Sequence, residues 1–146
     1  MAREIVNHLE LEFGSLVDSL KDLVNSVPPD RLYLTPPAVT IAESILRSAA
    51  TVEQTCGGLT SNLWDDPFEW TLPETLSNGE RVIEYLSEVD SALRRAFNAI
   101  VDDDALSKLV SVPSGEPGRL VSLLLETLVT AAEHRGRAVA TIKILK

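Results

Sequence analysis

The chain has 146 residues, the length of one ordinary domain, and 45% of them are hydrophobic, which is enough for a continuous core without disulfides or metal. We therefore expect a single domain over residues 1–146. Its formal net charge of −9, with acidic residues spread along the whole length, excludes nucleic acid and anionic membranes as favoured partners. The simplest role of this charge is solubility.

The compartment is indicated by the cysteine content and the N-terminus. Cys56 is the single cysteine, so no intramolecular disulfide can form, and this fits a reducing compartment. The N-terminus lacks a basic region followed by an apolar segment. No stretch approaches the roughly 18 uncharged apolar residues of a membrane span. We expect a cytoplasmic protein.

The first segment, from Arg3 to about Ser26, has the pattern of an amphipathic helix. Its apolar residues recur at steps of three and four: Ile5, Leu9, Phe13, Leu16, Leu20, Leu23 and Val27. Pro28 and Pro29 must end it, because proline lacks the amide that the helix needs. Residues 30–39 contain a second pair of prolines and form an extended, stiff connector.

The second helix is predicted to open with a capping box, in which the Thr40 side chain accepts from the amide of Glu43 and the Glu43 carboxylate reaches back. Its end is expected between Gly57 and Leu63, because paired glycines weaken a helix. The predicted apolar face consists of Ile41, Ile45, Ala49, Val52, Cys56 and Leu59. Cys56 is thus expected to be a packed core thiol, since reactive cysteines need exposure and a cationic neighbour.

Residues 64–73 form an aromatic connector that is broken by prolines. Its two tryptophans, Trp64 and Trp70, would wall a ligand site or a partner surface, or would cap the end of a bundle. The capping role is the commoner one for such residues, and we favour it here.

The third helix is predicted to begin with a second capping box, from Ser77 to Glu80, and to carry a heptad-like apolar seam as far as Ile100. The three aspartates at 102–104 start the next connector and are expected to cap a short turn at 104–110. Residues 111–118 read as a plain loop.

The last helical pattern runs from about Pro117 to Leu145. Gly136 lies in its middle at a cost of about 1 kcal/mol against alanine, which suggests a close helix approach there. The residues expected to face inward are Leu120, Leu124, Thr127, Leu128, Ala131, Ala138 and Ile142. No alternating pattern indicates a strand, so we predict an all-α four-helix bundle with long, proline-containing connections.

Polar and small residues form two stripes of helical spacing, one on the second helix and one on the last. These stripes are Thr40, Ser44, Arg47 and Thr51, and Thr130, His134, Arg137 and Thr141. Phosphate-binding glycine loops, zinc cysteine sets, nucleophile elbows and dinucleotide fingerprints do not occur in the sequence.

Five stretches in a fixed order resemble the DinB/YfiT-like family of four-helix bundles. They are the first helix, the connector from Val27 to Pro37, the capped helix from Thr40, the Leu86-Ser-Glu-Val-Asp-Ser-Ala-Leu-Arg helix, and Glu133-His-Arg-Gly-Arg. The last is the most specific, since it is similar to the family's His-x-x-x-His-Arg-Gly-Gln signature. The resemblance covers nearly the whole chain and implies the bundle fold.

The resemblance also implies a divalent metal held by three histidines, one on the second helix and two on the last. The matching positions here are Arg47, Thr130 and His134, so two of the three ligands are missing. Arg47 stays cationic and a threonine hydroxyl is a poor ligand for nickel or zinc. We expect no metal cofactor, with nickel or zinc at His134 as the alternative.

Two hypotheses for function follow from the resemblance. In the first, the chain is a metal-free small-molecule-binding or catalytically degenerate family member. In the alternative, it is an enzyme related to the family's metal-dependent thiol S-transferases and mycothiol-dependent isomerases, in which a thiolate attacks an electrophile.

The candidate pocket of the first hypothesis would hold a small anionic ligand beside the Arg47 guanidinium. The pocket candidates are Arg47, Thr130, His134, Ser44 and Arg137. In the competing interpretation, the Arg47 stem packs on its helix and its head pairs with Glu43.

Homodimerisation is the expected form of association. Leucine is more abundant on the last helix, at Leu123, Leu125 and Leu128, than one buried face needs.

Overall fold

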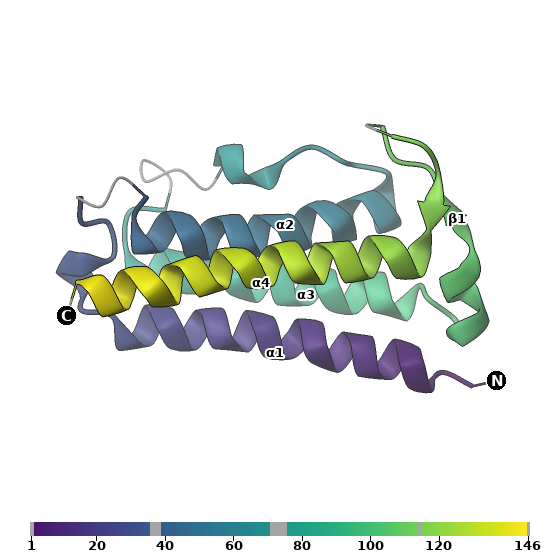
Figure 1. The fold of residues 1–146 in the computed structure, drawn as a ribbon, viewed down its shortest axis with the longest axis horizontal. Helices are drawn as coiled ribbons and strands as arrows, with labels where there is room; N and C mark the ends of the chain where they lie inside the picture. The colour runs from purple at the N-terminus through teal and green to yellow at the C-terminus, as the bar shows by residue number, and fades with distance from the viewer. Residues whose placement is uncertain (1, 36–38, 71–75, 114, 146) are drawn as a thin grey trace.

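A computed structural model describes residues 2–35, 39–70, 76–113 and 115–145. The described residues form four long helices, α1 (Glu4–Ser26), α2 (Ile41–Ser61), α3 (Gly79–Asn98) and α4 (Leu120–Ile144), which lie side by side (Figure 1). The described parts of the connections contain the 3₁₀ helices η1 (Pro29–Arg31), η2 (Pro67–Trp70) and η3 (Asp103–Ser107), and the strands β1 (Leu109–Val110) and β2 (Gly118–Arg119). This mostly helical architecture agrees with the expected all-α bundle. Pro36, Pro37 and Pro73 of the expected connectors lie outside the described residues.

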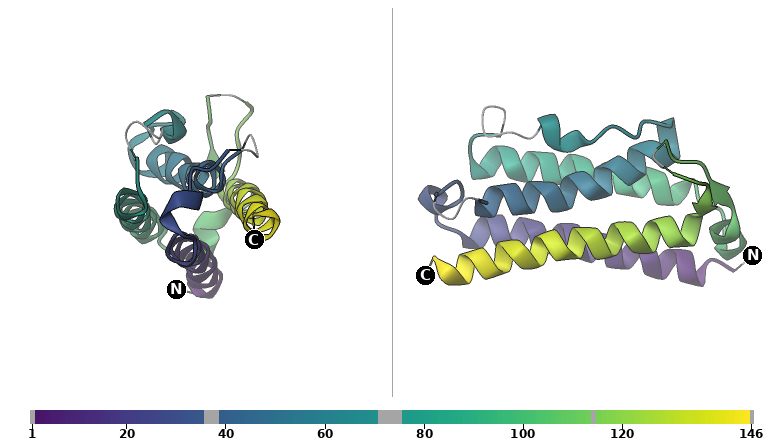
Figure 2. Two further views of the ribbon diagram at one scale, coloured as in Figure 1. Left: turned by 90° about the vertical axis from the view of Figure 1, so that its left-hand side faces the viewer. Right: turned by 45° about the horizontal axis from the view of Figure 1, so that its top comes forward.

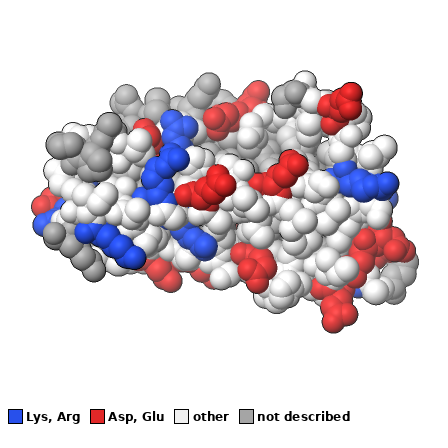
Figure 3. Space-filling view, in the orientation of Figure 1, with Lys and Arg blue, Asp and Glu red and all other residues white. Residues whose placement is uncertain are grey.

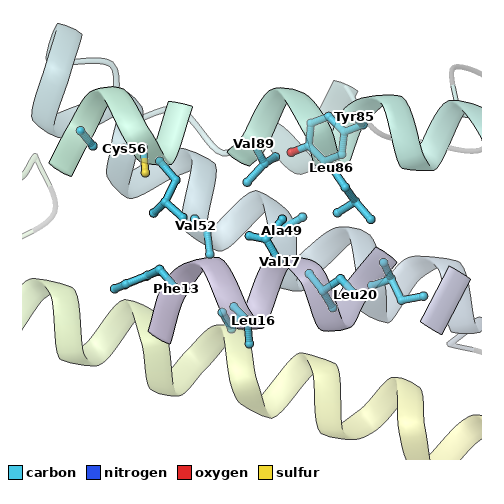
Figure 4. Packing of buried hydrophobic residues seen from close by; sticks show 14 of the residues in the cluster. Phe13, Leu16, Val17, Leu20, Ala49, Val52, Cys56, Tyr85, Leu86 and Val89 are labelled. Atoms are coloured by element: carbon cyan, nitrogen blue, oxygen red, sulfur yellow. The ribbon is translucent and has the colours of Figure 1, made fainter. Parts of the chain in front are cut away.

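The four helices surround one hydrophobic core. α2 packs chiefly against α4 and α3, whereas α1 packs chiefly against α3. The end-on view in Figure 2 shows α1 and α2 at opposite corners of the bundle. Figure 4 shows Phe13 and Leu20 of α1 and Val52 of α2 within this core. All four helices contribute side chains to the cluster, which sets their faces relative to one another.

The start of α1 differs from the predicted apolar face. Ile5 is 55% exposed, whereas Val6 is fully buried and begins the spacing that continues through Leu9 and Phe13. The Asp103 carboxylate accepts hydrogen bonds from the amides of Ile5 and Val6, at 3.2 and 3.0 Å. This contact from the distant η3 segment satisfies amides that the helix itself leaves unpaired. The expectation that Ile5 faces the core was wrong.

The N-terminus of α2 confirms half of the predicted capping box. The Thr40 hydroxyl accepts from the amide of Glu43 at 3.0 Å. The Glu43 carboxylate does not complete the box, because it lies 3.6 Å from Nε of Arg47, one turn further along the helix. The helix ends at Ser61, inside the predicted interval, and Asn62 follows in the left-handed conformation with φ of 55°.

The cap of α3 is Asn78 and not the predicted Ser77. The Asn78 side chain accepts from the amide of Arg81 at 3.0 Å, so the helix begins at Gly79. Asparagine and serine are about equally good N-cap residues, and the sequence alone leaves their competition open. Asp102 caps η3 in the same way through the amide of Ala105, close to the predicted turn.

A short antiparallel hairpin corrects the prediction that strands are absent and that residues 111–118 form a plain loop. Leu109 pairs with Arg119 and Val110 pairs with Gly118. Each strand has two residues, too few to produce an alternating pattern in the sequence. The hairpin delays the last helix, whose first residue is Leu120 and not Pro117.

The inner face of α4 is close to the predicted one, although Leu128 and Ile142 are only partly buried. Gly136 does not mark a close helix approach, since a Cβ at this position would have nothing within 4 Å. None of the described helices combines the length and the apolar character that a membrane span needs.

Candidate functional site

The α2–α4 seam is held by two buried polar contacts that fix how the helices face each other. The Thr55 and Thr127 hydroxyls lie 2.7 Å apart. About two turns back along α2 and one turn forward along α4, the Ser48 hydroxyl donates to the carbonyl of Ala131 at 2.6 Å. The helices run antiparallel (Figure 1), so one further turn in this register places Ser44 opposite the His134 region.

A groove opens along this seam at the end of the bundle where α2 ends and the β1–β2 hairpin leads into α4. Its volume is 470 Å³, which is suitable for a small organic molecule. It is lined by Thr51, Gln54, Thr55, Trp64, Val112, Pro113, Leu123, Glu126, Thr127 and Thr130. We call this hollow the α2–α4 groove.

Trp64 forms one wall of the groove and is fixed on three sides. Its ring lies so close to Gly58 that a Cβ there would be 2.3 Å from two ring carbons. Its Nε1 donates to the side chain of Asn62 at 2.9 Å, and its carbonyl accepts from Gln54 at 2.8 Å. Gly58 therefore makes room for the indole, and Trp64 lines the groove at this end of the bundle. Trp70 adds nothing here, because its side chain is not described.

The five predicted pocket residues divide between the groove and its neighbourhood. Thr130 lines the groove, whereas Ser44, Arg47, His134 and Arg137 are not among its lining residues. Thr51, Gln54 and Glu126 were not among the predicted pocket residues. Thr51 could have been identified from the sequence, because it belongs to the predicted polar stripe of the second helix. No feature of the sequence singles out Gln54.

Arg47 already has two partners. Its Nε lies 3.6 Å from the Glu43 carboxylate, which confirms the pairing that the sequence allowed. Its guanidinium carbon lies 4.0 Å from the centre of the Phe68 ring, a cation–π contact with η2. The side chain is 40% exposed, so the charge stays hydrated and is shared with Glu43. Arg47 is therefore no bare cation inside a pocket.

His134 and Ser44 hold the two buried side-chain atoms that lack a hydrogen-bond partner within the described part of the chain, Nδ1 and Oγ respectively. Ser44 is fully buried. Burial lowers the pKa of His134, and the charges of Arg137 and Arg47 lower it further, against the opposing effect of Glu133. The neutral form of the imidazole is therefore favoured over the charged form.

The residues at the expected metal position do not fit a divalent metal site. Across the described residues, no group of three histidine, cysteine or carboxylate side chains could hold a metal ion. Of the three positions matched by the resemblance, His134 supplies one imidazole, Arg47 is cationic and engaged with Glu43, and Thr130 offers a hydroxyl. One imidazole with two such neighbours does not hold nickel or zinc, which need several neutral or anionic donors.

Cys56 is a core thiol, as predicted. It is buried on α2, and burial raises the pKa of its thiol to about 12, with Glu53 adding to the shift and Arg95 opposing it. A thiol that stays protonated and out of reach of solvent is not a nucleophile at neutral pH.

A second hollow lies between α1 and α3, on the opposite side of the bundle from the α2–α4 groove. Its volume is 720 Å³, larger than that of the groove, and its wall includes Glu10, Asp18, Asp22 and Asp90. Asp90 already pairs with Arg94 at 3.2 Å. Glu10 lies 4.0 Å from Arg3, and Asp18 and Asp22 are exposed and solvated, so this surface is the weaker candidate.

Sequence models of known protein families give no match to the chain, and neither do curated proteins or solved structures. We therefore infer function from the geometry and the chemistry of the groove.

Proposed function

We propose that this chain is a metal-free, small-molecule-binding helical bundle whose ligand occupies the α2–α4 groove. The observation that carries the proposal is the built wall of this groove. A glycine at position 58 admits the Trp64 indole, and two further hydrogen bonds hold Trp64 in place. An aromatic wall beside several hydroxyls is the composition of a ligand site more than of a helix seam.

The proposal also assigns the chain to the DinB/YfiT-like bundles as a member without the metal. Four helices in the expected order support this assignment, together with a register that brings Arg47 and Ser44 of α2 near His134 of α4. The coulombic influence of Arg47 on His134 agrees with that proximity. The metal-dependent thiol S-transferase or isomerase alternative gains nothing from this donor set.

The other predicted pocket residues form the polar end beyond the groove. Arg47 would bind a small anion there after leaving Glu43 and Phe68, with His134 and Arg137 alongside. Figure 3 shows basic groups mostly on the left half of this face and acidic groups in its middle and right. The basic half of this face thus favours an anionic ligand, and the acidic half favours a cationic one.

A fragment screen followed by ¹H–¹⁵N NMR tests the proposal. Cationic, neutral and anionic fragments are all included, so that the result does not depend on ligand charge. We expect hits that shift the amide signals of Thr51, Thr55 and Thr127 and the indole signal of Trp64.

The blocking variant is Thr130→Phe, which fills the groove from the exposed side of α4. The matched control is Thr60→Phe, at an exposed threonine of α2 outside the groove lining. Thr130→Phe should abolish the shifts and Thr60→Phe should preserve them. Hits that map elsewhere, or that survive Thr130→Phe, would refute the groove as the binding site.

The remaining expectations concern extent, assembly and location. We take residues 1–146 as one domain, because all four helices contribute to one core cluster. A homodimer through α4 is supported by Leu125 and Val129, which are 48% and 57% exposed, while Leu123 and Leu128 are partly buried. Light scattering that gives the monomer mass would exclude it. The buried, unpaired Cys56 supports a cytoplasmic location.

A further inference from the structure

The hydroxyl hydrogens of the groove are already committed to other acceptors. Thr51 donates to the carbonyl of Arg47 at 2.8 Å, and Thr127 donates to the carbonyl of Leu123 at 2.8 Å. A threonine hydroxyl has one hydrogen, so the contact of 2.7 Å between Thr55 and Thr127 must use the hydrogen of Thr55. Each of the three hydroxyls therefore already donates its hydrogen, and its oxygen can still accept a hydrogen bond from a ligand.

The other polar side chains of the groove also offer more hydrogen-bond acceptors than donors. Gln54 uses its amide nitrogen on the carbonyl of Trp64 at 2.8 Å, which leaves its Oε1 as an acceptor. Glu126 is acceptor-only when ionised. The indole N–H of Trp64 is taken by Asn62. Among the side chains of the described lining residues, the remaining donors are the second amide hydrogen of Gln54 and the hydroxyl of Thr130.

We infer that the ligand of the α2–α4 groove is a small organic amine, bound as the ammonium ion with its apolar or aromatic body against Trp64. This inference rests on the proposed function and names the ligand class of the same site. An ammonium has three donors and no acceptor, which complements a wall of acceptors. A carboxylate would meet those acceptors with its own lone pairs.

Charge supports the same class of ligand. Glu126 is the one charged residue among the described residues that line the groove, and the whole chain carries a net charge of −9. Arg47 lies outside the groove lining and is paired with Glu43, so it does not offset this charge. The apolar side of the ligand has Leu123 and Pro113 as well as Trp64 to pack against.

Three probes that share a phenyl body test the inference: 2-phenylethylammonium, 3-phenylpropanoate and 3-phenylpropan-1-ol. Each is titrated into ¹⁵N-labelled protein at pH 7, and the Trp64 indole and Thr51 amide signals are followed. We expect the ammonium to bind at least about tenfold more tightly than the carboxylate, the ratio for one hydrogen bond to a charged group. The alcohol should fall between them.

Two substitutions test which atoms are responsible. Glu126→Gln keeps the shape and removes the charge, and it should weaken ammonium binding about threefold to fivefold, the effect of an exposed charge pair. Thr51→Val removes an acceptor and should weaken it about tenfold. Thr60→Val is the matched control, because Thr60 also donates to the carbonyl four residues before it, that of Cys56 at 2.8 Å, but lies outside the groove.

Several results would overturn the amine assignment. They are equal or tighter binding of the carboxylate, absence of ammonium binding, or a loss with Thr60→Val as large as that with Thr51→Val. The fragment screen, which contains cationic, neutral and anionic compounds, separates this failure from failure of the groove itself. Groove hits that are anionic or uncharged would leave the proposed function standing and reject the amine, whereas a screen without groove hits would reject both.

Discussion

Two glycine-to-alanine substitutions should have opposite effects, because one glycine makes room for Trp64 and the other has open space. At Gly58 a new Cβ would lie 2.3 Å from ring carbons of Trp64, far inside contact distance. At Gly136, in the middle of α4, it would meet nothing within 4 Å. The chemical change is the same and both glycines are helical.

The expected magnitudes follow from two opposing terms. Alanine in a helix interior is favoured over glycine by about 1 kcal/mol, so Gly136→Ala should raise the free energy of unfolding by about that amount. At Gly58 the same gain is opposed by overpacking, which costs about 1–3 kcal/mol. The indole cannot move freely, since its Nε1 donates to Asn62 and the Trp64 backbone carbonyl is held by Gln54. Gly58→Ala should therefore be destabilising by about 0–2 kcal/mol.

Urea unfolding followed by circular dichroism measures both changes on one scale. The Trp64 indole signal in the ¹H–¹⁵N spectrum reports whether the ring has moved. We expect a large shift of this signal in Gly58→Ala and none in Gly136→Ala. Equal stabilisation by the two substitutions, with Trp64 unmoved, would show that Gly58 does not make room for the groove wall.

Three further predictions concern the ends and the interior of the bundle. Asp103→Ala should lower the free energy of unfolding by about 1 kcal/mol, because the carboxylate caps the first amides of α1, whereas the exposed Asp104→Ala should change it little; urea titration measures both. Cys56, buried and with its pKa raised to about 12, should resist iodoacetamide in the native protein and react only at the rate of unfolding, which mass spectrometry follows; fast native alkylation would contradict this. Burial raises the pKa of Glu53 above its ordinary 4.5; the hydrogen bond that Glu53 accepts from Tyr85 opposes this shift, and the nearby charge of Glu88 adds to it. The wild type should therefore lose stability as pH rises through the native pKa of Glu53. The stability of Glu53→Gln relative to wild type should accordingly grow from pH 4 to pH 7, and a constant difference would refute this assignment.

The helices could be predicted from the sequence because their signals are local and repeated. The 3.6-residue spacing located all four, and the Thr40 cap and the predicted interval for the end of α2, between Gly57 and Leu63, were both correct. Cys56 could be placed in the core because its neighbours on that helical face are apolar. The features that failed depend on distant contacts or on very short elements.

Ile5 illustrates the first kind of failure, since the contact from Asp103 that fixes the start of α1 spans almost a hundred residues. The β1–β2 hairpin illustrates the second, because two-residue strands leave no alternating pattern. The groove could not be predicted in full from the sequence, for both reasons. Thr130 was predicted from its helical stripe, whereas the role of Trp64 depends on its packing over Gly58, which the glycine pair alone does not reveal.

Titration of ¹⁵N-labelled protein with 2-phenylethylammonium at pH 7 shows directly whether the α2–α4 groove binds an amine. We expect saturable shifts of the Trp64 indole and of the Thr51 and Thr55 amides, which Thr130→Phe should remove and Thr60→Phe should not. An unshifted Trp64 indole, or shifts confined to the acidic hollow between α1 and α3, would contradict this expectation.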